Sequence, residues 1–231
     1  TRIGTTVDGG FAEYCAVPVS QVYKVSKKLS FEQAAMTEPV SCCLHGIELC
    51  NIKCGDTVMV IGCGMIGLIM LQLAKLSGAA NIIAVEPIEE KKKQALELGA
   101  DIALDPKADN ISEVLKKYGL EQVDVVIECV GRPETIEQAI SLAGKYSTVM
   151  MFGLTKPDAE ISVKPFEIFK KEITLKSTYI NPYTFSAAIK LIESGKIDVS
   201  SMVYKKEPLT ELPDILSDGK RRSAGKYIIT M

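Results

Sequence analysis

The sequence predicts an α/β fold in which helices cover both faces of a six-stranded, parallel, doubly wound sheet. Short apolar and β-branched runs recur along the chain, and segments with helical spacing separate them. The first run leads into a glycine-rich turn, G-C-G-M-I-G at residues 62–67, which opens an apolar helix. The next run ends on an acidic residue, Glu86. Strand, glycine turn, helix, strand and terminal acid form the βαβ unit that is typical of dinucleotide-binding sheets.

The six predicted strands are buried runs that turn or charged residues bound. They cover residues 57–61, 81–85, 102–104, 123–129, 147–152 and 172–177. Helices are predicted between them at residues 68–76, 89–98, 111–118 and 134–142. Such sheets bind ligands where the carboxyl ends of the strands meet the reversal in strand order. We therefore expect Gly131 and residues 152–153 to line the site.

Further elements flank the sheet on both sides. Residues 9–18 predict a turn and an alternating strand, and residues 22–25 predict a second short strand. Ser30, with Gln33 three residues later, predicts a capped helix start, and another helix opens at Thr37. After the sheet, the pattern predicts helix at 185–194, strand at 201–204, helix at 209–217 and strand at 226–230.

Each position of the glycine turn has a physical reason. Gly62 permits the tight turn, Gly64 lets the backbone approach a pyrophosphate, and Gly67 lets helix and strand pack closely. Free N–H groups at the helix start, together with the helix dipole, favour the phosphates. Glu86 stands 19 residues after Gly67 (86 − 67), where an acid bonds the ribose hydroxyls. Its charge would repel a 2′-phosphate, so the sequence predicts NAD rather than NADP.

Composition argues against several classes of partner. The 231 residues are 47% hydrophobic and 24% charged, which is ordinary for a globular protein. A net charge of −2 indicates no nucleic-acid partner. No apolar run reaches the length of a membrane span, and the first residues show no signal-peptide pattern. We expect a cytoplasmic protein with no membrane partner.

The cysteines and the first residues carry separate expectations. The seven cysteines contain no C-x₂-C zinc pair, which favours reduced structural thiols over a zinc site. The chain opens T-R-I-G-T-T-V-D-G-G, without an initiator methionine or an element of its own before Gly9. We expect it to be a piece of a longer protein.

Several motifs together resemble one enzyme family. They are G-G-F-A-E-Y at residues 9–14, Glu38-Pro39, G-D-T-V at 55–58, the G-x-G-x-x-G turn and L-G-A-D at 98–101. In order and spacing they resemble the zinc-containing medium-chain dehydrogenases, in particular the sorbitol (polyol) and threonine dehydrogenase branch. The resemblance runs from about Gly9 to the end of the chain.

The resemblance implies a division of the chain and an activity. Residues 1–40 would be a remnant of a GroES-like catalytic domain, 41–180 an NAD-binding Rossmann domain, and 181–231 a return to the catalytic domain. The family oxidises secondary alcohols by hydride transfer to NAD, with a zinc ion lowering the pKa of the alcohol. The catalytic residues and the other zinc ligands are expected upstream of Thr1, so the chain alone would bind NAD without turnover. The predicted cofactor-contacting residues are Gly62, Gly64, Met65, Ile66, Gly67, Glu86, Lys91, Cys129, Val130, Gly131, Phe152, Gly153, Tyr179 and Ile180.

The metal prediction rests on one residue. The resemblance makes Glu38 a ligand of the zinc ion or of its water, whereas a plain first-turn glutamate favoured by the helix dipole is the alternative. His45 lies seven residues later, roughly 10 Å along a helix at about 1.5 Å per residue, so we expect it to pack or face the cofactor instead. Lys91 would reach the adenosine ribose, or else belong with Lys92 and Lys93 to a solvated helix start.

Other interpretations stay open at this point. The chain could belong to a zinc-free quinone or enoyl reductase, a non-catalytic NAD-sensing module or a methyltransferase, although Glu86 and the Glu38-Pro39 element argue against the first and the last. The alcohol could be a polyol, threonine, butanediol or a phosphorylated sugar alcohol. The sixth strand is a predicted sheet edge, and its pairing with a second copy would give a homodimer or a tetramer.

Overall fold

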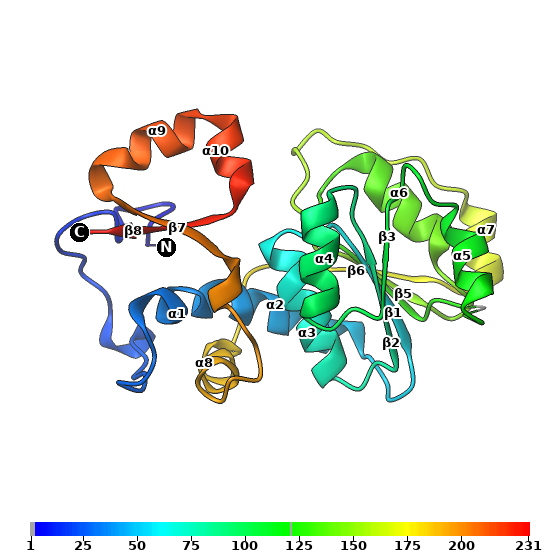
Figure 1. Ribbon diagram of the computed structural model, residues 1–231, viewed down its shortest axis with the longest axis horizontal. Helices are drawn as coiled ribbons and strands as arrows, with labels where there is room; N and C mark the ends of the chain where they lie inside the picture. Colours follow the sequence, from blue (N-terminus) through cyan, green and yellow to red (C-terminus); the bar gives the residue numbers. More distant parts are fainter. Residues whose placement is uncertain (1–2, 121) are drawn as a thin grey trace. The chain divides into compact units, whose positions relative to one another are not determined.

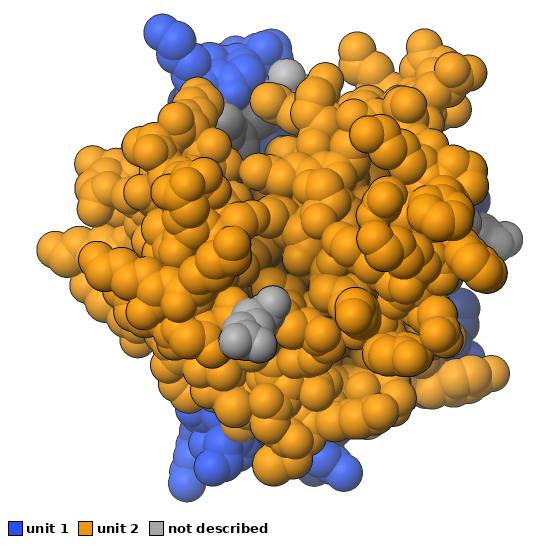
Figure 2. Space-filling model, turned by 90° about the vertical axis from the view of Figure 1, so that its right-hand side faces the viewer, with its two compact units in different colours: residues 1–37, 189–231 blue, residues 38–188 orange. Residues whose placement is uncertain are grey.

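The computed structural model describes residues 3–120 and 122–231, and the chain divides into two compact units. One unit combines residues 1–37 with residues 189–231, and the other contains residues 38–188 (Figure 2). The domain limits expected from the family resemblance, at residues 40 and 180, stay a prediction. Within the described ranges, no helix has both the length and the apolar character needed to cross a bilayer.

The larger unit is built on a six-stranded parallel sheet. The strands are β1 Thr57–Ile61, β2 Asn81–Val85, β3 Ile102–Leu104, β4 Val125–Glu128, β5 Thr148–Met151 and β6 Thr174–Ser177. Their order is β3-β2-β1-β4-β5-β6, and every neighbouring pair is parallel. The predicted doubly wound α/β sheet is therefore confirmed. The strand order reverses between β1 and β4, where Ile61 and Glu128 are paired at the carboxyl ends.

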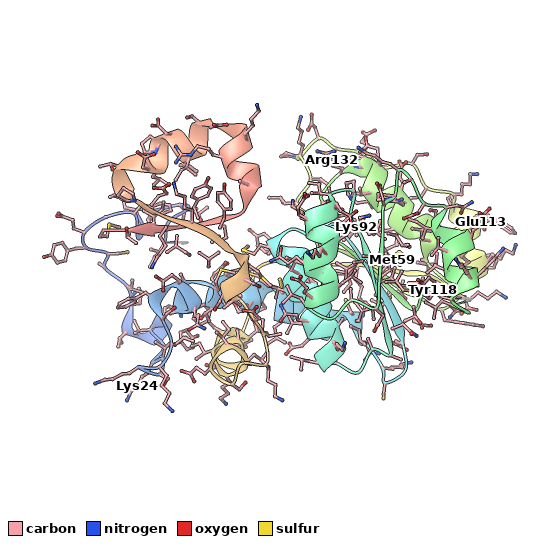
Figure 3. The ribbon with its side chains drawn as sticks, viewed as in Figure 1. Lys24, Met59, Lys92, Glu113, Tyr118 and Arg132 are labelled. Carbon is pink, nitrogen blue, oxygen red and sulfur yellow. The ribbon has the colours of Figure 1, made fainter. Side chains whose placement is uncertain are left out.

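Helices cover both faces of this sheet. The connecting helices are α3 Met65–Leu76, α4 Glu89–Glu97, α5 Ile111–Lys117, α6 Pro133–Leu142 and α7 Pro165–Lys171. In Figure 1, α3 and α4 lie on one side of the sheet, and α5, α6 and α7 lie on the other. Alternate strand residues such as Met59, labelled in Figure 3, and Val126 pack with Leu115 of α5 and Ile136 of α6 in one buried cluster. Burial of both faces explains why the central strands read as continuous apolar runs.

Helix α2, Thr37–Cys50, precedes β1 and forms where the sequence predicts a helix start. Val40, Cys43 and Ile47, which helical spacing places on one face of α2, are all buried. Gly46 lets the helix approach the sheet, because a Cβ atom there would lie 3.0 Å from ring carbons of Phe152. From Glu38 onward, α2 belongs to the same unit as the sheet.

The smaller unit is made of short elements from both ends of the chain. They are η1 Val19–Gln21, α1 Phe31–Ala35, η2 Ser200–Met202, β7 Val203–Pro208, η3 Leu209–Glu211, α9 Leu212–Ser217, α10 Gly219–Ala224 and β8 Lys226–Thr230. The capping box predicted for α1 is confirmed, with Ser30 and Gln33 each accepting a backbone N–H of the other. Strands β7 and β8 form a parallel pair. Helix α8, Phe185–Glu193, spans the sequence boundary between the units.

Two predicted strands are wrong. Residues 9–18 and 22–25 join no sheet, and apolar side chains such as Phe11, Tyr14 and Val22 are exposed. An extended segment becomes a strand only when a neighbouring backbone pairs with its N–H and C=O groups. Among the described residues, neither segment takes part in a strand pairing.

Two helices were missed by the sequence analysis, α7 and α10. Helix α7 begins at Pro165, a residue favoured in a first turn, and ends before Glu172, whose φ of +52° is left-handed. Lys171 donates from Nζ to the carbonyl oxygens of Ser141 and Ala143, at 3.2 and 2.9 Å. It thereby satisfies carbonyl groups at the end of α6.

Candidate functional site

The glycine turn joins β1 to α3 at the carboxyl edge of the sheet. Gly62 has a φ of +90°, and a Cβ atom there would lie 2.6 Å from Cγ2 of Val130. A Cβ atom at Gly67 would overlap the carbonyl oxygen of Gly62 and would lie 3.4 Å from Cγ1 of Val60. Gly62 is therefore required for its conformation and for space, and Gly67 for space alone.

Gly64 differs from these two glycines because the space around it is open. It is the N-cap of α3 in an extended conformation, and a Cβ atom there would meet no described heavy atom within 4 Å. No side chain caps the helix, and its first turn contains no acidic residue. Its first N–H groups therefore point out from the positive end of the helix dipole without a side-chain partner. This arrangement suits an anion such as a pyrophosphate.

Glu86 directly follows β2 and is only 5% exposed. Its Oε2 accepts a hydrogen bond from the N–H of Cys63 at 2.9 Å, and its Oε1 accepts one from the N–H of Ile88 at 3.0 Å. Glu86 therefore ties the end of β2 to the glycine turn, a role that the sequence analysis did not foresee. Each carboxylate oxygen keeps a second lone pair for a further donor. The contact with a ribose hydroxyl stays a prediction.

A second buried acid, Glu128, ends β4 and was not singled out from the sequence. It is fully buried, and its Oε1 accepts from the N–H groups of Val130 at 2.7 Å and Gly131 at 2.9 Å and from the hydroxyl of Thr135 at 2.8 Å. Its Oε2 has no hydrogen-bond partner in the described part of the structure. A charged residue at the carboxyl end of an otherwise apolar strand, D-V-V-I-E-C, was the available signal.

The turn that Glu128 holds packs closely against the segment after β5. Gly131 has a φ of +78°, and a Cβ atom there would lie 2.5 Å from the carbonyl oxygen of Leu154. The N–H groups of Phe152 and Gly153 both donate to the carbonyl oxygen of Glu128 at 2.9 Å. The structure therefore brings together the two loops, at Gly131 and at residues 152–153, that were predicted to line the ligand site.

A shallow cavity adjoins this turn at the start of α6. Its volume is about 700 Å³, and Figure 3 shows Arg132 beside the helix. The lining residues are Gly131, Arg132, Pro133, Glu134, Thr135, Lys156, Asp158 and Ala159. Of the predicted site residues, this cavity includes Gly131.

The segment after β6 is held against α2 of the same unit. Tyr179 and Ile180 are exposed, and the φ of Ile180 is +54°, which is rare for a β-branched residue. Asn181 donates from Nδ2 to Oγ of the buried Ser41 at 2.5 Å, and this hydroxyl donates to the carbonyl oxygen of Glu38 at 2.8 Å. Ser41 therefore links the predicted cofactor loop to the first turn of α2.

Glu38, the predicted metal ligand, is exposed in that first turn. Its Oε1 accepts a hydrogen bond from the thiol of Cys42, with an S···O distance of 3.3 Å. Within the described residues, no three His, Cys, Asp or Glu side chains are grouped so that they could hold a metal ion. His45 therefore belongs to no such group. A catalytic zinc ion needs about three protein ligands. The described residues therefore do not form a complete zinc site.

The lysines at the start of α4 differ in their surroundings. Lys92, labelled in Figure 3, forms an ion pair with Glu89 at 2.7 Å. Lys91 is partly exposed, and its charge opposes the rise in the pKa of the Cys63 thiol. Burial and then the charge of Glu86 outweigh it and raise that pKa to about 12. Lys91 therefore acts on the glycine turn electrostatically, and its contact with a ribose stays a prediction.

The seven cysteines are all free. Burial raises the pKa of Cys42 and Cys50 to about 12 and the pKa of Cys43 and Cys129 well above the ordinary value. These thiols are therefore protonated near neutral pH, which makes them poor nucleophiles.

The 3-2-1-4-5-6 strand order, the glycine turn, the open start of α3 and the acid after β2 together define a dinucleotide-binding α/β domain. The family model described as zinc-binding dehydrogenase matches residues 66–194. The chain therefore belongs to the zinc-binding dehydrogenase family, and the resemblance found in the sequence is confirmed.

Curated relatives cover most of this chain. (R,R)-Butanediol dehydrogenase of Bacillus subtilis is 34% identical over 96% of the chain and 64% of its own length. Erythritol/L-threitol dehydrogenase of Mycolicibacterium smegmatis is 32% identical over 92% of the chain and 60% of its own length. L-Threonine 3-dehydrogenase of Pyrococcus furiosus is 31% identical over 88% of the chain and 59% of its own length. The chain thus spans 59 to 64% of the length of these relatives.

Solved structures share the fold. A zinc-binding dehydrogenase structure from Sinorhizobium meliloti 1021, bound to NADP, has a TM-score of 0.92 and 36% identity and covers 97% of this chain and 66% of its own. An alcohol dehydrogenase from Escherichia coli CFT073, complexed with NADH, has a TM-score of 0.91 and 25% identity. The match covers 100% of this chain and 68% of that structure's chain. Both similarities extend over the sheet and the flanking segments described above.

Proposed function

We propose that this chain is the nicotinamide-dinucleotide-binding part of a dehydrogenase that oxidises a secondary alcohol, such as a polyol or sugar alcohol. The observation that carries the proposal is the glycine turn in front of the uncapped start of α3, where Gly64 leaves open space. Related structures with NADP and NADH, and relatives named for alcohol or polyol oxidation, support it. A bound nicotinamide would supply the hydride acceptor.

The chain's own residues would bind and orient the cofactor. The pyrophosphate would lie against the first N–H groups of α3, and Glu86 would receive the adenosine ribose. The turns at Gly131 and Gly153 would face the nicotinamide, with Tyr179 and Ile180 contributing from the segment after β6. The absence of side chains at Gly131 and Gly153 lets these two backbone segments approach each other closely.

We further propose NAD rather than NADP as the natural cofactor. Glu86 places a negative charge at the end of β2, and a 2′-phosphate beside it would be repelled. A relative bound to NADP at 36% identity makes this the point to test directly. Titration with NADH and NADPH, followed by nicotinamide fluorescence, should give at least tenfold tighter binding of NADH. Equal affinities would overturn the preference for NAD.

The alcohol-oxidising step would need residues beyond those described. We propose that Glu38 contributes one metal ligand or holds a metal-bound water, and that residues outside these 231 complete the site. The 231-residue chain should therefore bind NADH yet reduce no NAD detectably with sorbitol present. An assay of the full open reading frame against polyols, threonine and simple secondary alcohols, with and without a zinc chelator, tests the activity. Binding of NADH with no chelator-sensitive turnover by the full reading frame would favour a non-catalytic NAD-binding module or a zinc-free reductase.

We also propose that two copies pair through β6. This strand bonds to β5 on one side and forms an edge of the sheet on the other, and most of its residues are exposed. An unpaired edge is a template for a second strand. Sedimentation at micromolar concentration should show a dimer or tetramer, and a monomer alone would count against this assembly.

A further inference from the structure

The carboxylate of Glu128 is fully buried, but hydrogen bonds reach only one of its two oxygens. Its side chain is fully buried, and all three of its hydrogen bonds converge on Oε1. Oε2 accepts none, and no ion pair to Glu128 exists among the residues that the structure describes. A buried ionised group without full compensation is costly for a protein to keep. The charge therefore calls for an explanation beyond the local turn.

The local turn does not require a charge. A neutral side-chain oxygen can accept backbone N–H groups in the same way, as asparagine and serine do in many turns. Thr135 would still donate its hydroxyl to such an oxygen. The three contacts of Oε1 explain why an acceptor ends β4, but they leave the negative charge unexplained.

The position of Glu128 suggests what the charge does. The residue pairs with Ile61 at the reversal of the strand order, where α/β sheets bind their ligands. Its Oε2 would lie 2.7 Å from a Cβ atom at Gly153, and its Oε1 bonds the backbone of Gly131. A negative charge that is only partly compensated therefore lies next to the two glycine loops of the proposed nicotinamide side, and neither glycine has a side chain that would separate the charge from a bound ring.

We propose that Glu128 biases this site toward the oxidised cofactor. The nicotinamide ring of NAD⁺ carries a positive charge that the ring of NADH lacks, so a buried carboxylate favours the oxidised form selectively. This inference rests on the proposed nicotinamide site. At roughly 10 Å and an effective dielectric constant of about 20, one unit charge changes the relative affinity by about tenfold.

The test compares three ligands on the 231-residue chain. Kd is measured for NADH by fluorescence, and for NAD⁺ and ADP-ribose by competition, with the wild type and with Glu128→Gln. The substitution keeps an acceptor for the turn and removes the charge. We expect Kd for NAD⁺ to rise about tenfold relative to Kd for NADH, while Kd for ADP-ribose, which has no nicotinamide, stays within about twofold. A ratio of NAD⁺ to NADH affinity that stays within about twofold of the wild type overturns the proposal.

Two control variants separate charge from structure. Thr135→Val removes one donor to Oε1 and keeps the charge, so the NAD⁺ to NADH ratio should not change. Glu86→Gln lies on the adenosine side, so it should change the affinity of all three ligands by the same factor. A shifted ratio in either control would contradict the assignment to Glu128.

A further variant keeps the test decisive if Glu128→Gln fails to fold. Thr135→Lys starts from a partly exposed position and adds a positive charge at the residue whose hydroxyl contacts Oε1, so it should shift the ratio in the same direction. An unshifted ratio in this variant would overturn the proposal. Failure of the wild type to bind NADH, NAD⁺ and ADP-ribose would instead overturn the proposed function. Binding of all three with no change in ratio would overturn this inference alone.

Discussion

The N–H of Cys63 donates a 2.9 Å hydrogen bond to Oε2 of Glu86, so the middle of the glycine turn is tied to the end of the neighbouring strand. The other oxygen of Glu86 accepts from the N–H of Ile88. One carboxylate thus fixes two loops that surround the proposed adenosine site. Its structural role and its proposed ligand role share the same two oxygens, and substitutions at this position should affect both.

Glu86→Gln should relax the choice between NADH and NADPH. The variant removes the charge that would repel a 2′-phosphate, so the preference for NADH should fall about tenfold. It should also lower the free energy of unfolding by about 1–3 kcal/mol, because one amide N–H₂ would face a backbone N–H. Fluorescence titration and urea unfolding measure the two effects. Glu90→Gln, exposed in the first turn of α4, is the matched control and should change neither.

The glycines of the turn should separate folding from binding. Gly67→Ala should destabilise the fold by about 3 kcal/mol or more, because its Cβ atom would overlap the carbonyl oxygen of Gly62. Gly64→Ala should leave unfolding within about 1 kcal/mol of the wild type, since its Cβ atom meets open space. It should nevertheless weaken NADH binding at least tenfold by filling the space proposed for the pyrophosphate. If Gly64→Ala bound NADH normally, the phosphates would have to lie elsewhere.

The sheet was predictable because its strands are buried on both faces. Apolar runs such as Thr57–Ile61 and Asn81–Val85 need no alternation to be recognised, and their limits match the prediction. Residues 9–18 show the opposite case. Their alternating pattern is suited to a strand, but pairing depends on a partner that the pattern does not contain.

The site was predictable where the local sequence determines it. The glycine turn and Glu86 follow from spacing within one βαβ unit. The role of Glu128 could not be predicted from spacing, because it depends on three donors around a turn. The hydrogen bond from Asn181 to Ser41 could not be predicted either, because it joins positions 140 residues apart. A lone acid at the end of an apolar strand is a usable signal for future sequences of this kind.

Alkaline pH should weaken the fold through the buried thiols. The pKa of Cys63 is raised from 9.0 to about 12, mainly by burial. Above pH 9 the unfolded chain therefore loses a proton that the folded chain keeps, and the free energy of unfolding falls until about pH 12. Cys63→Ala removes this contribution. The free energy of unfolding of Cys63→Ala, minus that of the wild type, should therefore increase by up to about 1.4 kcal/mol per pH unit over this range.

The alkaline prediction is checked by urea unfolding at pH 8, 9 and 10. The wild type and Cys63→Ala should differ increasingly as the pH rises. Cys54→Ala, at an exposed cysteine, is the control and should run parallel to the wild type. Parallel curves for Cys63→Ala and the wild type would show that this thiol ionises equally in both states.

Ser41→Ala should loosen the segment after β6. Ser41 is fully buried, and its hydroxyl accepts from Asn181 and donates to the carbonyl oxygen of Glu38. Its loss leaves the amide of Asn181 without this acceptor, and we expect a cost of about 1–3 kcal/mol. Hydrogen exchange of residues 178–184 should quicken in the variant, since the left-handed Ile180 is then held less firmly.

Ser141→Ala is the matched control for Ser41→Ala. Its hydroxyl makes the same bond to the carbonyl oxygen three residues earlier, at the same 2.8 Å, but Ser141 is exposed on α6. Its substitution should cost less than about 0.5 kcal/mol. NADH affinity should fall with Ser41→Ala and not with Ser141→Ala, because Ser41, unlike Ser141, bonds Asn181 in the segment that carries Tyr179 and Ile180. Equal effects of the two variants would mean that Asn181 does not position the proposed nicotinamide loop.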